Sequence, residues 1–376
     1  MNILLINYME TTAPGGINKV VREIAKNLSK THEITVIQPN PFDLPAKEVY
    51  NGFQIIRIKS RYGKYIYDLN PEIYFYLKNN LKILNPDIIH VHGYHTLFSF
   101  EVIYTIKRTI PNVPIIISPH YGIFSHDTIA GKYLWNIHNL IGRKILKYSD
   151  TILAASNFEA RNLNVDLNIS KYKITIISHG VDNIDLKNKK DNKSPIKLLY
   201  VGYLLELKGV QYILETLKEL KKRNVEAHLT IIGEGPYEKN LKKLANKLNL
   251  NGLIKWQGFI HDKQNNELLK YFKESDIFLL LSKSENYGIV VAESLAMGTP
   301  VIVTKRTALV EFLDESGCYG VDFPPVPIEV ANLILEICEK NIAIDENSTK
   351  IRNWSKVSIN YEKMYLNLLR EAKNAN

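Results

Sequence analysis

The sequence is poor in cysteine and contains no long uninterrupted apolar run. Only two of its 376 residues are cysteines, Cys318 and Cys338, so one bridge at most can form. This excludes a disulfide-stapled scaffold and favours a reducing, cytoplasmic location. The longest apolar stretch, Ile289–Val303, is interrupted by Glu293 and is shorter than the roughly 20 residues that span a bilayer. We therefore expect no membrane-spanning helix, while peripheral attachment to a membrane stays open.

Several ligand-binding motifs are also missing. There is no Asp-x-Asp pair of the kind that holds a divalent metal, and no Cys/His cluster at zinc spacing. The turn after the first strand, in MNILLINYMETTAPGG, lacks the G-x-G-x-x-G of nicotinamide dehydrogenases, and no nucleic-acid-binding module occurs. Met1–Asn7 lacks the basic flank and cleavage site of a signal peptide. The sequence thus predicts no metal, no nucleic-acid partner and no targeting segment.

What is present is the composition of a globular protein with excess positive charge. Hydrophobic residues make up 45% of the chain and charged residues 23%, and the length suits two domains of ordinary size. The 48 Lys and Arg residues against 39 Asp and Glu residues give a formal net charge of +9. Such a charge suits an anionic partner, for instance a phosphorylated ligand or a membrane surface.

Short apolar runs alternate with amphipathic ones through the first half, which is typical of βα units and a doubly wound parallel sheet. Strands are expected at Ile3–Asn7, Glu33–Gln38, Phe53–Lys59, Ile88–Val91, Ile115–Ser118, Thr151–Ala155 and Lys173–Ser178. Helices are expected at Asn18–Lys30, Pro71–Leu84 and Trp135–Tyr148. The polar stretch Asn183–Ser194 then predicts a surface linker.

After this linker the alternation restarts. Strands are expected at Lys197–Val201, Ala227–Ile232, Ile254–Trp256, Ile277–Leu281 and Pro300–Thr304, and helices at Gly209–Arg223, Tyr237–Leu248, Asn265–Lys273 and Tyr287–Met297. The amphipathic tail Ile351–Leu369 predicts a last helix. We therefore expect an α/β protein with two Rossmann-like parallel-sheet domains facing a deep cleft: residues 1–183, a linker over 184–195, residues 196–356, and a helix over 357–376 that returns to the first domain. Ligands are expected at the carboxyl ends of the strands.

The most informative segment is Ser282–Pro300, SKSENYGIVVAESLAMGTP. A helix that begins near Tyr287 presents its first backbone N–H groups as an anion site, and Gly288 allows close approach of a ligand. Glu285 stands just before those donors as an acceptor for hydroxyl groups. Glu293 has apolar neighbours, so we expect it to be buried or half-buried, and a buried carboxylate needs polar partners such as a ribose diol.

This segment resembles the E-x7-E signature of retaining GT-B glycosyltransferases of family four, which use nucleotide-activated sugars. Other segments match that family in order and spacing along nearly the whole chain: Pro14-Gly15-Gly16, Asp87–His92, Pro119-His120, Thr151–Ser156, Ile176–Asp182, Val201–Gly209, Ile231–Pro236 and Trp256–Phe259. The resemblance implies transfer of a hexose from a UDP- or GDP-linked donor to a glycan, lipid-linked or small-molecule acceptor. It implies no cofactor besides the donor substrate.

The resemblance also implies a role for each matching residue. Glu285 would hold the sugar hydroxyls, Glu293 the ribose hydroxyls, and Lys208 would place its ammonium on the diphosphate. Gly16 would close over the phosphates, and His120 would lie beside the anomeric carbon. The expected catalytic residues are thus His120, Glu285 and Lys208. The expected donor-binding residues are Gly16, Gly202, Tyr203, Lys208, Gly258, Phe259, Glu285, Asn286, Tyr287, Gly288, Glu293 and Arg306.

Two positions depart from the family pattern. Tyr203 stands where the family usually places an arginine on the diphosphate, and a tyrosine cannot supply that charge. Arg306 is our candidate for its replacement, although a solvated loop residue is an equal interpretation. Thr307 and Ala308 stand where the family generally has a glycine pair. These departures keep a second hypothesis open, a catalytically silent nucleotide-sugar-binding or regulatory protein of the same fold.

The histidines and the acceptor surface are less decisive. His90 and His92 alternate on a strand and are expected on one face, where packing is favoured over metal ligation. His179 is expected to serve the turn at a strand end. Aromatic and basic residues mingle in Arg61–Tyr76 and Trp135–Tyr148, which suits an anionic membrane surface or, equally, an ordinary packed helix.

Overall fold

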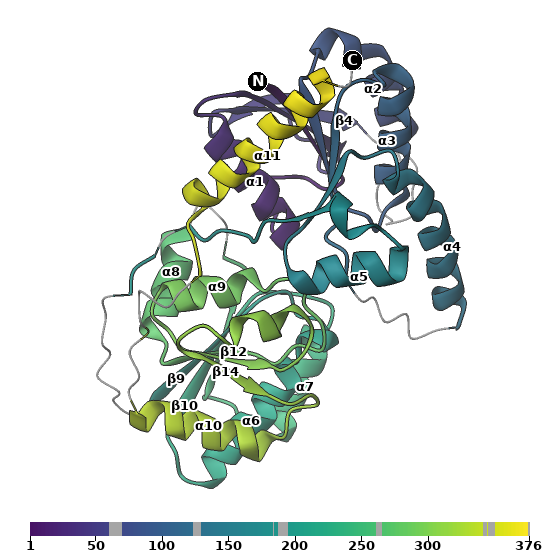
Figure 1. Ribbon diagram of the computed structural model, residues 1–376. Helices are drawn as coiled ribbons and strands as arrows, with labels where there is room; N and C mark the ends of the chain where they lie inside the picture. Colours follow the sequence, from purple (N-terminus) through teal and green to yellow (C-terminus); the bar gives the residue numbers. More distant parts are fainter. Residues whose placement is uncertain are drawn as a thin grey trace. The chain divides into compact units, whose positions relative to one another are not determined.

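The chain divides into two units in the computed structural model, which describes residues 1–59, 70–122, 129–182, 184–186, 195–260, 265–340, 344 and 350–374 (Figure 1). Unit 1 comprises Met1–His179 together with Trp354–Asn376, and unit 2 comprises Gly180–Asn353. Most of the linker expected over 184–195 lies outside the described residues, as does the greater part of Arg61–Tyr76.

Unit 1 is built on an eight-stranded sheet in the order β3-β4-β2-β1-β5-β6-β7-β8. Neighbouring strands pair in parallel, except that β3 and β4 are antiparallel. Strands β5, β6 and β7 are fully buried, which explains their near-continuous apolar sequences. The strands are β1 (Asn2–Asn7), β2 (Glu33–Asn40), β3 (Lys47–Tyr50), β4 (Phe53–Lys59), β5 (Ile88–His92), β6 (Ile115–Ser118), β7 (Thr151–Ala154) and β8 (Ile174–Ile176).

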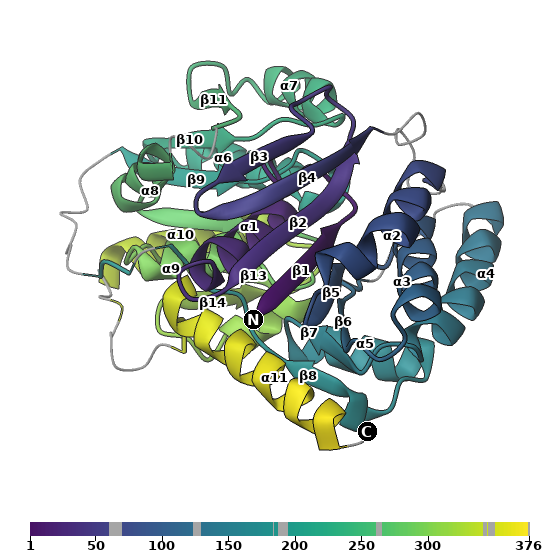
Figure 2. The ribbon, with the colours of Figure 1, turned by 90° about the horizontal axis from the view of Figure 1, so that it is seen from above.

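Helices cover both faces of this sheet (Figure 2). On one face α1 (Gly16–Leu28) and α11 (Trp354–Asn374) pack against each other, so the end of the chain completes the unit in which the chain begins. On the other face lie α2 (Pro71–Leu84), α3 (Leu97–Thr109), α4 (Ile129–Leu146) and α5 (Asn157–Leu167). Local sequence sets some of these ends: Asn70 caps α2 by accepting a hydrogen bond from the Ile73 N–H, directly before Pro71.

Unit 2 contains a six-stranded parallel sheet in the order β11-β10-β9-β12-β13-β14. Its strands are β9 (Ile196–Val201), β10 (Ala227–Ile232), β11 (Ile254–Gly258), β12 (Ile277–Leu280), β13 (Val301–Thr304) and β14 (Cys318–Val321). Its helices are α6 (Val210–Lys222), α7 (Glu238–Lys247), α8 (Asn265–Glu274), α9 (Ile289–Ala296) and α10 (Pro327–Lys340). One core of buried aliphatic and aromatic side chains joins the sheet to these helices.

The parallel strands of unit 2 follow the 3-2-1-4-5-6 order of the Rossmann fold, and those of unit 1 follow the same order with β8 added after the sixth strand, so the expected doubly wound α/β class is confirmed. In that order the winding reverses between the first and fourth strands. The reversal falls between β9 and β12 in unit 2 and between β1 and β5 in unit 1. Ligands of open α/β sheets bind at this point, outside the carboxyl ends of the strands, so a ligand site is expected at each of the two reversals.

Besides 3-10 turns, the part of the chain that the structure describes contains five strands and α-helices that were not expected: β3, α3, α5, β14 and α10. Helix α3 buries side chains from most of its circumference, so its sequence lacks a clear helical period. Helix α5 is short and rich in Asn, and the exposed edge strand β3 is four residues long. Each lacks the amphipathic contrast on which the sequence analysis depended.

Candidate functional site

In unit 2 the predicted site residues gather where the sheet reverses its winding. Strand β9 leads into the turn that carries Gly202 and Tyr203, followed by the 3-10 turn Glu206–Lys208. Strand β12 leads into the loop that carries Ser282, Glu285 and Asn286, followed by α9. Since β9 and β12 are parallel neighbours, both loops leave the same edge of the sheet.

Lys208 and Glu285 form an ion pair at this edge. The Lys208 Nζ donates to Glu285 Oε1 at 2.6 Å, and the Ser282 hydroxyl donates to the same oxygen at 3.0 Å. Both side chains are partly exposed, the lysine to 21% and the glutamate to 13%. The pair therefore combines a cation and a hydroxyl-accepting carboxylate within reach of solvent, which are the two groups that a phosphorylated sugar requires.

Backbone contact between the two loops fixes this pair. Gly209 follows Lys208 in a left-handed conformation, with φ of 76°. A Cβ at this position would come within 1.9 Å of the Leu281 carbonyl oxygen, so another residue would push the Lys208 turn away from β12. The Lys283 N–H also donates to the Leu207 carbonyl at 2.7 Å. Glycine at 209 is thus a requirement of the site's geometry.

Helix α9 begins one loop residue beyond Tyr287, with Gly288 as its N-cap at φ of 100° and no side-chain cap. Its first N–H groups have no intrahelical acceptor, which gives this end partial positive charge. Glu293 lies in the second turn and is 4% exposed, so the expectation of a buried carboxylate is confirmed. The Tyr287 ring packs edge-on against Phe312, 5.3 Å between centroids, and anchors the start of the helix.

The remaining donor-binding candidates follow neighbouring strands of the same sheet. Tyr203 is 59% exposed, and its carbonyl accepts a hydrogen bond from the buried Tyr200 hydroxyl at 3.2 Å. Gly258 ends β11, and the Phe259 N–H donates to Glu234 at 3.4 Å. Since β9, β10 and β11 are parallel neighbours, these residues share one edge with Lys208.

Arg306 and Thr307 follow β13 on the other side of β12. Arg306 is exposed, and its guanidinium carbon lies 5.2 Å from the centroid of the Phe323 ring. Thr307 is buried and begins a 3-10 turn, Thr307–Phe312, in a left-handed conformation with φ of 57°. In sequence, Thr307 is a departure from the family pattern, and no role was expected for it.

In unit 1 Gly16 begins α1, and a buried polar network holds the preceding loop. Glu10 and Arg57 form an ion pair at 2.9 Å in which both side chains are 1% exposed. Glu10 also accepts hydrogen bonds from the Thr12 N–H and hydroxyl, and the Arg22 guanidinium donates to the Thr11 carbonyl at 2.8 Å. The glycine loop therefore starts from a fixed base, which nothing in the sequence pattern indicated.

Buried histidines occupy the corresponding edge of the unit 1 sheet. The rings of His90 and His92 lie 4.1 Å apart between centroids, which confirms that they share a face. His92 Nδ1 lies 3.3 Å from His120 Nε2, and the His120 ring lies 6.0 Å from that of His179. His90 bonds the Tyr365 hydroxyl of α11 at 2.7 Å. Among the described residues, no three His, Cys, Asp or Glu side chains are arranged to hold a metal ion.

His120 itself adopts a strained conformation, with φ of 51°. Its carbonyl lies 2.9 Å from the His95 Nε2, and the next N–H, that of Tyr121, donates to the Glu159 carboxylate at 2.6 Å. Glu159 is 1% exposed and also accepts from the Ala155 N–H at 2.8 Å. His95 and Glu159 thus hold the His120 turn, and the Ser156-x-x-Glu159 spacing of a capping box could have drawn attention to Glu159.

Burial controls ionisation throughout this group. Desolvation lowers the pKa of His90 and His179 to about 3 and that of His95 to about 4, and it lowers the pKa of His92 and His120 well below the ordinary 6.5. These imidazoles are neutral near pH 7. Burial also raises the pKa of Glu159 to about 7, against the opposing effect of two backbone hydrogen bonds.

These pKa values predict that acid destabilises the protein. Between pH 6.5 and about 4 the unfolded histidines bind protons and the folded ones do not, so the free energy of unfolding falls as the pH falls. Glu159 acts in the opposite direction between about pH 4.5 and 7, but it is one group against these five histidines and His138, whose pKa burial also lowers. We expect the urea concentration at the midpoint of unfolding to be lower at pH 5 than at pH 7. The slope of the free energy of unfolding against pH reports the difference in bound protons between the unfolded and folded states, and His92→Gln should reduce this difference by about one proton.

His228→Gln is the matched control, because His228 is exposed on a strand of unit 2. Urea titrations monitored by circular dichroism at several pH values give the slopes. Equal slopes for the native protein and His92→Gln would contradict the assignment.

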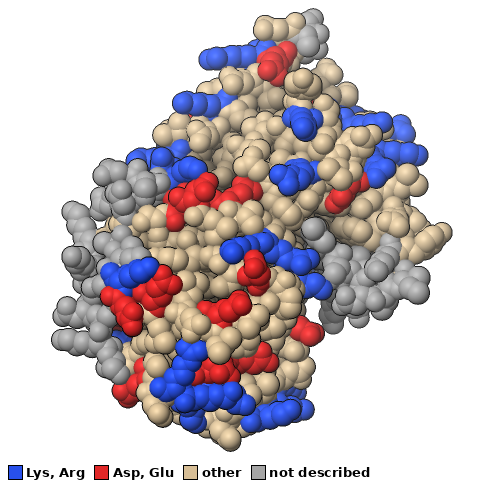
Figure 3. Space-filling view, turned by 60° about the horizontal axis from the view of Figure 1, so that its bottom comes forward, with Lys and Arg blue, Asp and Glu red and all other residues tan. Residues whose placement is uncertain are grey.

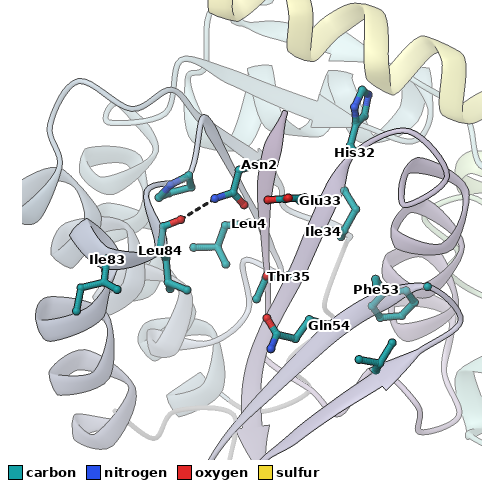
Figure 4. A pocket seen from close by; sticks show the side chains of 13 residues that line it. Asn2, Leu4, His32, Glu33, Ile34, Thr35, Phe53, Gln54, Ile83 and Leu84 are labelled. Atoms are coloured by element: carbon teal, nitrogen blue, oxygen red, sulfur yellow. Dashed lines mark hydrogen bonds between the residues drawn. The ribbon is translucent and has the colours of Figure 1, made fainter.

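Two further features of the surface are a hollow in unit 1 and the distribution of charge on one face of the molecule (Figure 3). The hollow, of about 490 Å³, lies over the amino-terminal parts of β1 and β2, where Asn2 donates to the Leu84 carbonyl at 2.6 Å (Figure 4). None of the predicted site residues lines it. On the face in Figure 3, basic and acidic side chains are interspersed and form no continuous basic surface for nucleic acid. Within the described segments, no helix is long and apolar enough to cross a bilayer.

Two family descriptions match the chain, one for each half. Residues 14–183 match "Glycosyltransferase Family 4", and residues 182–354 match "Glycosyl transferases group 1". The O-antigen biosynthesis glycosyltransferase WclY of Escherichia coli is 26% identical and the match covers 95% of this chain and 96% of that protein. The GDP-mannose:cellobiosyl-diphosphopolyprenol alpha-mannosyltransferase of Xanthomonas campestris is 24% identical, with 81% and 78% covered.

Among solved structures, the sucrose-phosphate synthase of Thermosynechococcus elongatus is similar in fold. It superposes with a TM-score of 0.82 at 18% identity, and the match covers 98% of this chain and 99% of the other. With matches along both halves of the sequence and this agreement in fold, the chain belongs to the family-four glycosyltransferases of the GT-B fold.

Proposed function

We propose that this glycosyltransferase moves a hexose, with retention of configuration, from a UDP- or GDP-linked donor to a glycan, lipid-linked or small-molecule acceptor. The observation that carries the proposal is the Lys208–Glu285 pair beside the uncapped N-terminus of α9. Both lie at the edge of unit 2 where a nucleotide is expected. The Xanthomonas relative, by its name, uses GDP-mannose and a polyprenol-linked acceptor, which supports donors and acceptors of these classes.

The proposed chemistry follows from the charges that develop during transfer. The bond between the anomeric carbon and the diphosphate oxygen breaks, so positive charge develops on the sugar and negative charge on the departing oxygen. The Lys208 ammonium and the N–H groups at the start of α9 stabilise that oxygen. When the diphosphate binds, the Lys208 ammonium leaves Glu285 and pairs with the phosphate oxygens. The Glu285 carboxylate then accepts hydrogen bonds from the sugar hydroxyls. By the family resemblance, Glu293 takes the ribose, Gly258 and Phe259 border the base, and His120 orients donor or acceptor.

We further propose that the transfer needs no divalent metal. The lysine and the helix end supply positive charge to the diphosphate directly, which is the task that a metal performs in other sugar transferases. On this proposal a chelator leaves the rate unchanged, and loss of activity with EDTA that Mg²⁺ restores would overturn it.

Assays with a panel of nucleotide sugars test the function. UDP-glucose, UDP-N-acetylglucosamine and GDP-mannose are tested by thermal shift and by release of UDP or GDP. We expect at least one of them to raise Tm and to be turned over, because a ligand that binds only the folded state stabilises it. Lys208→Ala should lower kcat/KM for that donor by about 100-fold or more, the usual loss when a donor to a developing oxyanion is removed.

Lys222→Ala is the control for this variant, because Lys222 forms an ion pair with Glu219 of the same 2.6 Å length on α6. It should retain the native kcat/KM. Donor binding without any turnover would favour the alternative hypothesis of a catalytically silent nucleotide-sugar-binding protein.

Arg306 is proposed to supply the diphosphate charge that Tyr203 lacks. Its guanidinium rests over the Phe323 ring and is exposed, so it can leave the ring for a ligand. We expect Arg306→Ala to raise the donor KM by about ten-fold or more, since a charge-assisted hydrogen bond to phosphate is lost. Lys305→Ala is the control, because Lys305 is the adjacent exposed cation and pairs with Asp322 at 3.6 Å. Equal donor KM values for Arg306→Ala and Lys305→Ala would contradict this role of Arg306, and Lys208 would then be the cation proposed to contact the diphosphate.

We also propose that unit 1 contacts the surface of an anionic membrane through α4. Five apolar side chains of this helix are between 41% and 67% exposed and recur at helical spacing: Tyr133, Leu134, Ile137, Leu140 and Ile141. Lys144 and Lys147 are exposed at the carboxyl end of the same stripe. Trp135 is not part of it, because its ring stacks on His138, 5.0 Å between centroids, on the packed side of the helix. An apolar stripe with a basic border fits a lipid surface.

Sedimentation with vesicles of phosphatidylcholine and phosphatidylglycerol in a 7:3 ratio tests this contact. We expect the native protein to bind these vesicles in a salt-sensitive way. The double variant Leu134→Glu/Leu140→Glu should bind about ten-fold or more weakly, because two carboxylates replace apolar area that the lipid would cover. Ile83→Glu is the control, since Ile83 is 79% exposed in the same unit but lies on α2. Equal loss in both variants, or no binding by the native protein, would contradict the proposal.

A further inference from the structure

Thr307 is in a backbone conformation that its side chain disfavours. Its φ of 57° lies in the left-handed region, where a β-branched residue is a genuine outlier, and the residue is buried. Strain of this kind persists where the surroundings over-determine it, and it concentrates at functional sites. The hydrogen bonds of the Thr307 side chain indicate which contact requires this backbone conformation.

The Thr307 hydroxyl holds the backbone of Glu285. It accepts a hydrogen bond from the Glu285 N–H at 3.1 Å and donates to the Arg306 carbonyl at 2.7 Å, which uses the hydroxyl as acceptor and donor at once. The next residue, Ala308, donates its N–H to the Glu285 carbonyl at 3.3 Å. Glu285 is therefore held at its N–H and carbonyl by this turn, while its side chain is held by Lys208 and Ser282.

The same 3-10 turn, Thr307–Phe312, supports the other end of the loop. A Cβ at Gly288 would come within 2.9 Å of Leu309 Cδ2, and the Phe312 ring contacts Tyr287. The Thr304 hydroxyl, at the end of β13, donates to the Ser282 carbonyl at 2.6 Å. The segment from Thr304 to Phe312 thus contacts the loop from Ser282 to Gly288 at both ends and at Glu285. Within this segment, the Thr307 hydroxyl bonds the backbone N–H of Glu285 itself.

We infer that Thr307 is a positioning residue for Glu285, and that the strained backbone at Thr307 is retained because its hydroxyl fixes the glutamate toward the donor sugar. This inference rests on the proposed function and extends it to a residue that does not itself touch the substrate. One ordinary hydrogen bond returns less free energy than such a conformation costs, so Thr307 is poorly explained by stability alone.

Three substitutions separate the hydroxyl from the strain. Thr307→Val keeps the branched side chain and removes the hydroxyl, Thr307→Ser keeps the hydroxyl, and Thr307→Gly removes both hydroxyl and strain. For the donor sugar nucleotide, we expect kcat/KM to fall by about ten-fold in the Val and Gly variants, the loss of one hydrogen bond, and to stay within about two-fold in the Ser variant. Thr307→Gly should melt at a temperature equal to or about 2 °C above that of the native protein despite its lower activity.

Binding of UDP and GDP without a sugar distinguishes positioning from a general structural role. These ligands lack the part that Glu285 holds, so their Kd should be unchanged in Thr307→Val while the Kd of the sugar nucleotide rises. An equal rise for both ligands, or native kcat/KM in Thr307→Val, would overturn the inference.

Amide hydrogen exchange makes the test independent of the enzyme assay. The Glu285 N–H should exchange about ten-fold faster in Thr307→Val than in the native protein, and at the native rate in Thr307→Ser. If the native protein neither binds nor turns over any nucleotide sugar, the proposed function fails, while this exchange still reports on the contact. Unchanged exchange in Thr307→Val would refute the contact itself.

Discussion

The Lys208–Glu285 ion pair depends on a constraint of the backbone rather than on the side chains alone. It forms because two parallel strands, β9 and β12, end side by side and their loops come into van der Waals contact at Gly209 and the Leu281 carbonyl. Neither strand could shift along the other without separating the charges. The position of this ion pair therefore follows from the register of the sheet, and position 209 requires glycine because main chain meets main chain there.

Unit 1 organises its polar groups in the opposite way. The edge of unit 2 carries an ion pair open to solvent, whereas unit 1 buries a group of imidazoles that desolvation keeps neutral. A neutral imidazole can donate at one nitrogen and accept at the other, so it suits the orientation of hydroxyl groups. The strained turn at His120 is held between His95 and Glu159, just as the strained turn at Thr307 is held against Glu285. In unit 1 the residue with the unfavourable φ is His120, itself a proposed substrate residue, whereas in unit 2 it is Thr307, which contacts the proposed substrate residue Glu285.

The fold class could be predicted from the sequence because buried strands leave a simple pattern of continuous apolar residues. The apolar runs that became β5, β6 and β12 are buried on both faces, and such strands have few alternatives. The shared face of His90 and His92 and the burial of Glu293 followed from strand alternation and from apolar neighbours. Helix α3 was missed because it packs on several sides at once, and β3 because it is a short exposed edge.

The supporting contacts of the site could not be predicted, because they join residues far apart in the chain. Nothing local in the sequence indicates that Thr307 bonds the Glu285 N–H, that Glu159 bonds the Tyr121 N–H, or that Glu10 pairs with Arg57. Each of these contacts depends on the tertiary path of the chain, which brings together elements that are distant in sequence. The family pattern predicted a glycine at position 307, whereas the structure has a threonine that adopts a glycine-like backbone and adds a hydroxyl.

The return of the last helix to the first unit bears on how the chain is made. One of the two hydrogen-bond partners of the His90 ring is Tyr365, which lies 275 residues later in the sequence, after the whole of unit 2. During synthesis on the ribosome, unit 2 is a continuous segment and can fold as soon as it emerges. Until α11 has been synthesised, the part of the unit 1 sheet that this helix covers stays exposed. Of the two units, unit 1 is therefore completed after unit 2, and a nascent chain exposes His90 until α11 has formed.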